Sequence, residues 1–370
     1  MKSDVFYFSF KKNKKSVLQY IDALYDNSKL KVTKKNALIA VKLHMGEIGN
    51  TSFIKPLFVK KIIENLKKDG LKPFLTDTTT LYIGQRSNAV DYLNAAVYNG
   101  FGYESIGCPI IISDGLRSQN GKTVETKFSS NFQIIKYASD IAHSDGVVVL
   151  SHVKGHVVAG YGGALKNIAM GMATRSTKQQ MHGDVKPQIK TEKCSGCGTC
   201  VAYCPGKAIT IKDGKAVFNL NHCIGCADCI TVCTTGCLKV LKNESSEKIL
   251  EKMGDVIYAI ANDFKKPMTF FNFVMDVTPD CDCLDYSRYP IVPDIGILAS
   301  YDPVAIDKAS IDLIKSEPYY FNQDQNDFEL AVDQDKFCKK NGNVNYDRLL
   351  KYCENLGVGS TEYNLVELTY

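Results

Sequence analysis

Eight of the fourteen cysteines in this 370-residue chain stand in two tight runs that repeat each other at an offset of 29 residues. Both runs have the spacing C-x2-C-x2-C-x3-C. The first run consists of Cys194, Cys197, Cys200 and Cys204, and the second of Cys223, Cys226, Cys229 and Cys233. Three cysteines within seven residues place three thiolates on one loop, and the fourth leaves that loop on a short helix. The spacing therefore predicts metal ligands rather than a disulfide framework.

This duplication resembles the bacterial two-cluster ferredoxins across roughly 50 residues. In that family the fourth cysteine of each run ligates the cluster of the other run. The resemblance implies two [4Fe–4S] clusters. Their expected ligand sets are Cys194, Cys197, Cys200 and Cys233 for one cluster, and Cys223, Cys226, Cys229 and Cys204 for the other.

Two features leave alternatives open at this site. A pair of zinc sites would also use cysteines, although three ligands in seven residues exceed the needs of a tetrahedral zinc knuckle. Cys237 stands where the first copy has Ala208, and Thr234 stands where it has Pro205. Cys237 either substitutes for Cys233 or is a buried apolar filler.

The charge balance excludes nucleic acid as an expected partner. The chain has 45 Lys and Arg against 40 Asp and Glu, and thiolate-bound clusters would lower the net charge further. The basic run of Lys11, Lys12, Lys14 and Lys15 is typical of a solvated face. The first residues do not have the pattern of a secretory leader, and no apolar stretch is long enough to span a membrane. We expect a cytoplasmic protein without membrane insertion, in a compartment that keeps its cysteines reduced.

The rest of the chain alternates between two hydrophobic periods. Strands are predicted at 37–45, 73–77, 108–113, 145–153, 268–277 and 293–300, and helices at 54–70, 87–102, 246–264 and 302–317. The expected fold class is α/β, a mostly parallel sheet with flanking helices, plus an inserted small ferredoxin-like α+β module. The expected division is 1–188 and 244–370 for the two parts of the α/β domain and 189–243 for the module. Three separate domains are the alternative.

A second group of polar residues follows the predicted strand 145–153. His152, Lys154, His156 and Lys166 surround the glycines Gly160, Gly162 and Gly163 in the segment 151–171. In open parallel sheets, ligands bind at the carboxyl ends of the strands. The glycines and Lys166 are therefore predicted to bind an anionic cofactor or substrate, with a helix from about Ala164 pointing its amides at the anion. The alternative is a tight strand-to-helix turn with solvated charges.

The remaining cysteines divide into two classes. Cys281 and Cys283 flank Asp282 shortly after Asp276, and with Asp276 or a histidine they could form a mononuclear or third redox site. A reduced turn with exposed thiols is the alternative for this pair. Core positions are predicted for Cys108, Cys338 and Cys353.

The segments GYGGALKNIAMG, VKLHMGE, TDTTTLYIGQR and NFVMDVTPDCDC, together with the cysteine runs, identify the chain as similar to the family of the domain of unknown function DUF362. This resemblance implies iron–sulfur binding and no settled reaction. The order His156, Lys166, His182 also resembles the N-terminal domain of nickel-pincer lactate racemases. That resemblance implies a cofactor on Lys166, a metal on His182 and proton transfer by His156, with His44 as a candidate second catalytic histidine.

Three functions are therefore compatible with the sequence. The first is a redox enzyme in which electrons pass between the clusters and a pocket where His152, His156 and Lys166 are catalytic. The second is a non-catalytic electron carrier or cluster-transfer partner, and the third is a racemase-like enzyme. The expected partner is a redox protein or a small-molecule substrate.

Overall fold

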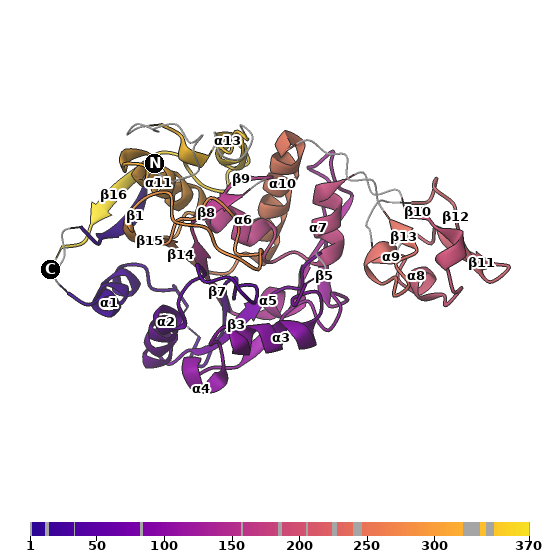
Figure 1. Cartoon of the computed structure of the whole chain (residues 1–370), viewed down its shortest axis with the longest axis horizontal. Coiled ribbons are helices and arrows are strands. Elements are labelled where there is room, and N and C mark those ends of the chain that lie inside the picture. Colours follow the sequence, from indigo (N-terminus) through magenta and orange to yellow (C-terminus); the bar gives the residue numbers. More distant parts are fainter. Residues whose placement is uncertain are drawn as a thin grey trace.

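The computed structural model describes residues 2–11, 15–32, 34–81, 84–156, 158–183, 187–204, 206–223, 228–239, 246–320, 334–337 and 344–369. At its centre lies an eight-stranded sheet flanked by helices (Figure 1). The strands are, in sheet order, β16 (Tyr363–Glu367), β1 (Ser3–Ser9), β15 (Gly296–Ser300), β14 (Met268–Val274), β7 (Gly146–His152), β2 (Leu38–Lys42), β3 (Lys72–Asp77) and β4 (Ile110–Ile112).

The sheet is mostly parallel, as the sequence predicted. β14, β7, β2, β3 and β4 form one parallel block, and β15 alone in this sheet runs opposite to both of its neighbours, β14 and β1. The central strand β7 has the sequence GVVVLSH and is buried along its whole length. Its run of three valines and a leucine is typical of a strand that is covered on both faces.

Side chains alternate between two hydrophobic cores, one on each face of the sheet. On β7, Val147 and Val149 face one core, and Val148 and Leu150 face the other. The first core is covered by α5 (Ser139–His143), α6 (Ala164–Ala169), α7 (Arg175–His182), α10 (Ser246–Phe264), α11 (Pro303–Ser316) and α13 (Asp347–Asn355). The second is covered by α1 (Val17–Asn27), α2 (Pro56–Lys68), α3 (Ala89–Tyr98) and α4 (Tyr103–Ile106).

The predicted helices and strands are confirmed with small shifts of their ends. α11 begins where the sequence places it, since Asp302 accepts hydrogen bonds from two amides of the first turn and Pro303 occupies the first helical position. β1, β16 and the helices α1, α4, α5, α7 and α13 were not predicted from the sequence. Nor were two hairpins, β5 (Gly121–Glu125) with β6 (Ile134–Ala138), and β8 (Lys154–His156) with β9 (Gly160–Gly162).

The cysteine segment has small elements of its own. They are β10 (Gln188–Ile189), η1 (Thr191–Lys193), α8 (Thr199–Ala202), β11 (Ile209–Lys212), β12 (Lys215–Phe218), α9 (Asp228–Thr231) and β13 (Leu238–Lys239). β10 pairs with β13 and β11 with β12, both antiparallel. The segment lies beside α7, away from the large sheet (Figure 1). The large sheet contains strands that precede this segment in the sequence and strands that follow it. The division of the chain into 1–188, 189–243 and 244–370 remains a prediction.

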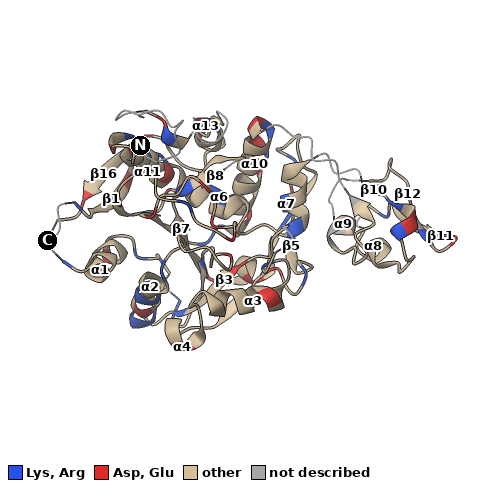
Figure 2. Ribbon diagram, viewed as in Figure 1, with Lys and Arg blue, Asp and Glu red and all other residues tan. Residues whose placement is uncertain are grey.

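Charged residues of both signs are spread over the helices of the large part and over the cysteine segment (Figure 2). Within the described ranges, no helix combines the length and apolar character needed to cross a membrane.

Candidate functional site

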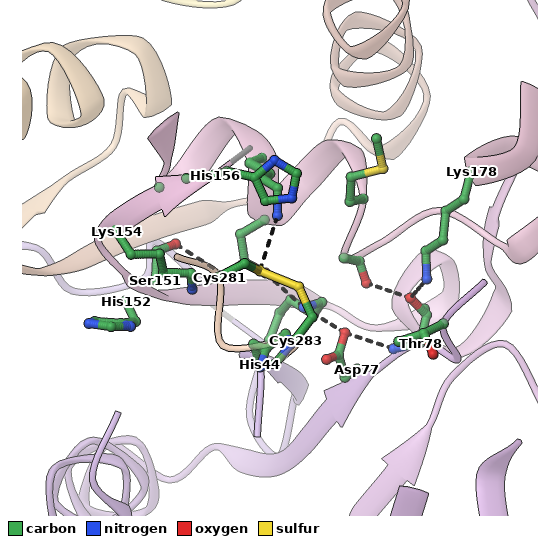
Figure 3. A pocket seen from close by; sticks show the side chains of 18 of the residues that line it. His44, Asp77, Thr78, Ser151, His152, Lys154, His156, Lys178, Cys281 and Cys283 are labelled. Atoms are coloured by element: carbon green, nitrogen blue, oxygen red, sulfur yellow. Dashed lines mark hydrogen bonds and ion pairs between the residues drawn. A yellow bond between two sulfur atoms is a disulfide. The ribbon is translucent and has the colours of Figure 1, made fainter. Parts of the chain in front are cut away.

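A cavity of about 110 Å³ lies at the carboxyl ends of β2, β3 and β7. Its lining is rich in cations and imidazoles and includes one disulfide (Figure 3). The charged residues, histidines and cysteines among those that line it are Lys42, His44, Asp77, Arg86, His152, Lys154, His156, Lys166, Lys178, His182, Cys281 and Cys283. The cavity is therefore at the edge of the sheet where ligands of parallel α/β proteins bind.

Four of the five Lys and Arg residues in the lining contact oxygen atoms of the described residues. Lys42 forms a buried ion pair with Asp77 at 2.8 Å, and Arg86 pairs with Glu47 at 2.9 Å. Lys154 contacts the carboxylate of Asp282 at 2.7 Å. Lys178 donates hydrogen bonds to the hydroxyl of Thr78 and the carbonyl of Thr79. Burial lowers the pKa of Lys178 to about 8.

Lys166 differs from these cations. In the part of the chain that the structure describes, it forms no ion pair with a carboxylate, and its Nζ lies 3.9 Å from Sγ of Cys281. Burial, reinforced by the charge of Lys154, lowers the pKa of the Lys166 ammonium group to about 7. Near neutral pH this amine can therefore hold or release a proton inside the cavity.

Two of the histidines that line the cavity, His156 and His44, are held in the neutral form. The pKa of His156 is well below its usual range because the ring is buried and Lys166 is nearby. Its Nδ1 accepts hydrogen bonds from the backbone N–H groups of Val158 and Ala159, so the proton of the neutral ring is assigned to Nε2. Burial and the charge of Arg86 lower the pKa of His44 in the same way.

Asp282 anchors the segment that follows β14. Its carboxylate accepts from Nδ1 of His152 at 2.9 Å and from Nζ of Lys154 at 2.7 Å, and the side chain is fully buried. Burial opposes ionisation, but the positive charges of His152 and Lys154 outweigh it and hold the pKa of Asp282 well below its usual range. These contacts fix the backbone between Cys281 and Cys283.

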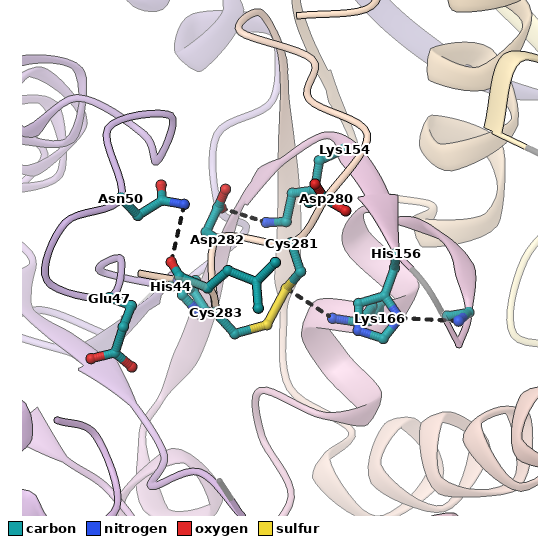
Figure 4. The surroundings of a disulfide bond; sticks show 12 residues. His44, Glu47, Asn50, Lys154, His156, Lys166, Asp280, Cys281, Asp282 and Cys283 are labelled. Atoms are coloured by element: carbon teal, nitrogen blue, oxygen red, sulfur yellow. Dashed lines mark hydrogen bonds and ion pairs between the residues drawn. A yellow bond between two sulfur atoms is a disulfide. The ribbon is translucent and has the colours of Figure 1, made fainter. Parts of the chain in front are cut away.

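Cys281 and Cys283 form a disulfide that faces the cavity (Figure 4). Cys281 is buried and Cys283 is half-buried. The alternative of a reduced turn with exposed thiols is therefore wrong for this structure, because the turn is folded inward by the ion pairs of Asp282. The two sulfur atoms and one ring nitrogen of His156 lie within 4.8 Å of one another, so these side chains also have the spacing of a metal site.

The residues predicted as catalytic or cofactor-binding mostly meet at this cavity. His152, His156, Lys166, Gly162 and Gly163 all line it, and so do His44 and His182, which were singled out by the racemase resemblance. Gly160 is not part of the lining. It has a positive φ of 71° and packs against Val344 and Tyr346.

One detail of the predicted anion site is wrong. The helix that begins at Ala164 exists as α6, but its first amides do not face the cavity. The N–H groups of Ala164 and Leu165 donate to the carboxylate of Asp307, on α11, at 2.7 and 2.9 Å. An anion in the cavity would therefore depend on side-chain cations instead of on the helix amides.

Four charged residues of the lining were not predicted from the sequence, namely Lys42, Asp77, Arg86 and Lys178. Lys42 and Asp77 are the last residues of β2 and β3. Polar side chains at the carboxyl ends of neighbouring parallel strands were the signal that could have identified this pair. Arg86 and Lys178 reach the cavity from a loop and a helix, where no such pattern exists.

In the cysteine segment, the structure brings Cys194, Cys197, Cys200 and Cys233 to the lining of one small cavity. Cys233 comes from the second run and the other three come from the first. Cys237 lines the same cavity, with its Sγ 3.4 Å from that of Cys233. Gly196 and Gly198 have positive φ values of 70° and 75°, which turn the loop around this space.

The other cysteines of the segment are less completely described. Cys204, Cys223 and Cys229 belong to the same small core, and Sγ of Cys204 accepts a hydrogen bond from the amide of Ala208 at 3.2 Å. Cys226 lies outside the described residues, and so does Cys338. Cys108 and Cys353 are buried in the large part, as predicted.

Comparison with known proteins gives a family and two distant structural likenesses. A Thermotoga maritima protein solved by a structural genomics consortium has a TM-score of 0.40 and 10% identity, with 77% of this chain and 54% of that one covered. The lactate racemase apoprotein from Thermoanaerobacterium thermosaccharolyticum has a TM-score of 0.35 and 14% identity, with 75% of this chain and 51% of that one covered. This chain thus spans about half the length of each.

No curated protein matches the sequence. The model of the family described as "Domain of unknown function (DUF362)" matches residues 39–312, which is most of the chain and includes the cavity and the cysteine segment. The chain therefore belongs to the DUF362 family.

Proposed function

We propose that this protein is an iron–sulfur oxidoreductase in which the cysteine segment moves electrons to or from an anionic substrate in the cavity at the carboxyl ends of β2, β3 and β7. The observation that carries the proposal is the meeting of Cys233 with Cys194, Cys197 and Cys200 around one small cavity. Those four cysteines are the ligand set that the ferredoxin-like duplication implies.

The local chemistry of this cysteine cavity suits an iron–sulfur cluster. Cys194 Sγ lies 3.5 Å from the amide nitrogen of Ala216, which donates to it, and N–H donors of this kind stabilise anionic sulfur. A Cβ on Gly196 would lie 2.2 Å from the carbonyl oxygen of Gly214, so only glycine fits at this position of the loop. A bound cluster would supply one-electron transfer.

The large cavity is suited to a small anion. Lys166 has no carboxylate partner among the described residues, so part of its charge is available to a ligand. His156 presents its Nε2–H as a hydrogen-bond donor to a substrate, and Lys166, with its pKa of about 7, can return a proton to the substrate as it is reduced. His152 is engaged by Asp282, and we assign it the role of positioning that carboxylate rather than of acid or base.

Helix α7 connects the two sites. Lys178 and His182, on α7, line the large cavity, and α7 packs against α9, the helix of the cysteine segment that contains Cys229. A single helix thus borders the substrate cavity on one side and the electron-transfer segment on the other. This contact is the proposed route between the two sites.

The test is anaerobic purification of the full chain with iron and sulfide analysis, followed by electron paramagnetic resonance after reduction with dithionite. Iron and sulfide matching two cubane clusters, with signals that disappear in Cys194→Ser and Cys223→Ser variants, are expected. Stoichiometric zinc without iron would refute the proposal. The non-catalytic carrier would be favoured if the protein holds clusters and its Lys166→Ala variant still reduces a partner protein as well as the wild type does.

A racemase-like enzyme is the second candidate. The specific observation in its favour is that His44, His156, Lys166 and His182 all line one cavity, and that the lowered pKa of Lys166 makes its amine a nucleophile near neutral pH. The intact mass of the purified chain distinguishes the two candidates. A covalent adduct and bound nickel that are both lost in Lys166→Ala would favour the racemase-like enzyme.

The compartment and partner are part of the same proposal. Ten of the described cysteines are unbridged, which favours a reducing compartment and hence the cytoplasm. We expect a redox protein to deliver or remove the electrons at the cysteine segment.

A further inference from the structure

We infer that Cys281 and Cys283 are a redox-active pair, a dithiol that forms and breaks its disulfide reversibly while facing the cavity. This inference extends the proposed function, because it names the group in the cavity that receives the electrons. It rests on that function only for the identity of the electron donor. The pair itself is argued from its position, its anchoring and its neighbours.

The bond is too local to be a structural brace. The two cysteines are separated by one residue, and their Cα atoms are 5.2 Å apart. A disulfide stabilises a fold mainly by constraining the unfolded chain, and this effect grows with the length of the closed loop. A loop of three residues gains little by that mechanism. Stabilisation of the fold therefore does not account for this bridge.

The backbone at the pair is held by contacts that do not involve sulfur. Asp282, between the two cysteines, is bound by His152 and Lys154. Its carbonyl also accepts from the N–H of Glu47 at 3.2 Å. Because these contacts survive when the disulfide opens, the two sulfur atoms stay in place for the bond to form again. Such a pair can cycle without refolding of the site.

The surroundings of the sulfur atoms favour the reduced form as well as the oxidised one. Nζ of Lys166 lies 3.9 Å from Sγ of Cys281, and a nearby cation stabilises a thiolate. One ring nitrogen of His156 lies within 4.8 Å of both sulfur atoms, and the neutral ring carries a hydrogen-bond donor at Nε2. In Figure 4 both side chains lie on the same side of the disulfide. A purely structural bridge needs neither.

The Cys281–Cys283 disulfide exchanges two electrons and two protons in each cycle. Reduction breaks the bond between the two sulfur atoms, takes up two electrons and two protons, and leaves two thiols. The electrons come one at a time from a one-electron donor that docks at the cysteine segment, or through that segment itself. Oxidation by a two-electron acceptor in the cavity returns the disulfide. The pair thus converts one-electron supply into two-electron chemistry.

The experiment is a redox titration of the full, anaerobically purified protein in buffers of reduced and oxidised dithiothreitol. After each equilibration the free thiols are alkylated, and the peptide containing residues 281–283 is quantified by mass spectrometry. We expect complete, reversible interconversion with the slope of a two-electron couple. The buried thiol of Cys108 should give no such transition, and Cys108→Ala should leave the curve of the pair unchanged.

Variants test the role of the neighbours. Cys281→Ser and Cys283→Ser should each leave one thiol that alkylates at every potential. Lys166→Ala should shift the thiol-to-disulfide ratio several-fold toward the disulfide. Lys166→Arg, which keeps a positive charge, should bring the ratio most of the way back to the wild-type value. A merely structural effect of Lys166 would not be rescued by the arginine. Circular dichroism of each variant confirms that the fold is retained.

Two results would overturn the inference. A bridge that stays oxidised until the protein unfolds would be structural. A pair that is permanently reduced and holds a stoichiometric metal ion, lost in His156→Ala, would be a metal site.

A third comparison separates the inference from the proposed function. If dithiothreitol cycles the pair but dithionite reduces it equally fast in the wild type and in Cys194→Ser, the redox pair stands and electron delivery through the cysteine segment fails.

Discussion

The carboxylate of Asp307 accepts a hydrogen bond of 2.7 Å from the backbone N–H of Ala164, across 143 residues of sequence. Asp307 lies on α11 and Ala164 is the first residue of α6, the helix that contains Lys166. The helix cap next to the cavity is thus supplied by a residue that follows the cysteine segment in the chain. Segments on both sides of that segment are therefore needed to position Lys166.

Replacement of Asp307 by asparagine should destabilise the protein. The carboxylate accepts from the amides of Ala164 and Leu165 and from the side-chain amide of Asn272, and an asparagine would turn an N–H donor toward at least one of these donors. An unsatisfied buried donor costs about 1–3 kcal/mol. Urea unfolding measures this loss. Asp26→Asn, at an exposed surface pair with Lys29, is the control and should cost less than about 1 kcal/mol.

The same pair of proteins tests the ionisation of Asp307. Burial raises the pKa of this carboxyl to about 6, against the 3.8 of an unperturbed aspartate. Between these two values the folded state keeps a proton that the unfolded state has lost, so the contribution of Asp307 to stability falls as the pH rises from 4 to 6. Asparagine does not titrate. The stability difference between wild type and Asp307→Asn should therefore widen as the pH is lowered from 7 to 4.

Unfolding free energies at a series of pH values provide this measurement. All other groups are common to both proteins and cancel in the difference. A difference that narrows at low pH would mean that the hydrogen bonds to Asp307 outweigh its burial and that its pKa is depressed.

The buried ion pair between Lys42 and Asp77 should be costly to break from one side. The side chains are 1% and 5% exposed, and Asp77 also accepts from the amide of Thr78. Removing one partner leaves an uncompensated buried charge, for which about 3–5 kcal/mol is typical. Asp77→Asn should therefore lower stability strongly, as thermal and urea unfolding would report. Lys127→Met, at the exposed pair with Glu125, should change stability by less than about 0.5 kcal/mol.

A double variant separates the charge effect from a packing effect. Lys42→Met combined with Asp77→Leu should be less destabilised than the sum of the single variants, because neither buried charge then lacks a partner. Strictly additive losses would show that packing of the two side chains, and not their charges, stabilises this edge of the sheet.

The sequence predicted the parallel sheet and the edge at which its cavity lies, because β7 contains a run of apolar residues and ends at His152, with His156 shortly after it. It did not predict β1, which is the second strand from one edge of the sheet and is held there by partners near the other end of the chain, Gly296–Ser300 and Tyr363–Glu367. Pairing over such distances leaves no local pattern. The inward turn at Cys281 was missed for the same reason, since Asp282 is anchored by His152 and Lys154 more than 100 residues earlier.

Cys233, the last cysteine of the second run, and Cys237, four residues later, should differ in their effect on iron content. Cys233 and Cys237 line the same cavity as Cys194, but only Cys233 has the position of the fourth cysteine in the repeated spacing. Cys233→Ser should therefore lose about half of the iron expected for two clusters, and Cys237→Ser should keep all of it. The measurement is iron and sulfide per chain in anaerobically purified protein, with Cys108→Ala as a control outside the segment.

Because the two sulfur atoms are only 3.4 Å apart, Cys237 is close enough to replace its neighbour. If Cys233→Ser kept its iron and only the double variant lost it, Cys237 would replace Cys233 as a cluster ligand. The ligand assignment from the ferredoxin spacing would then be wrong at this position.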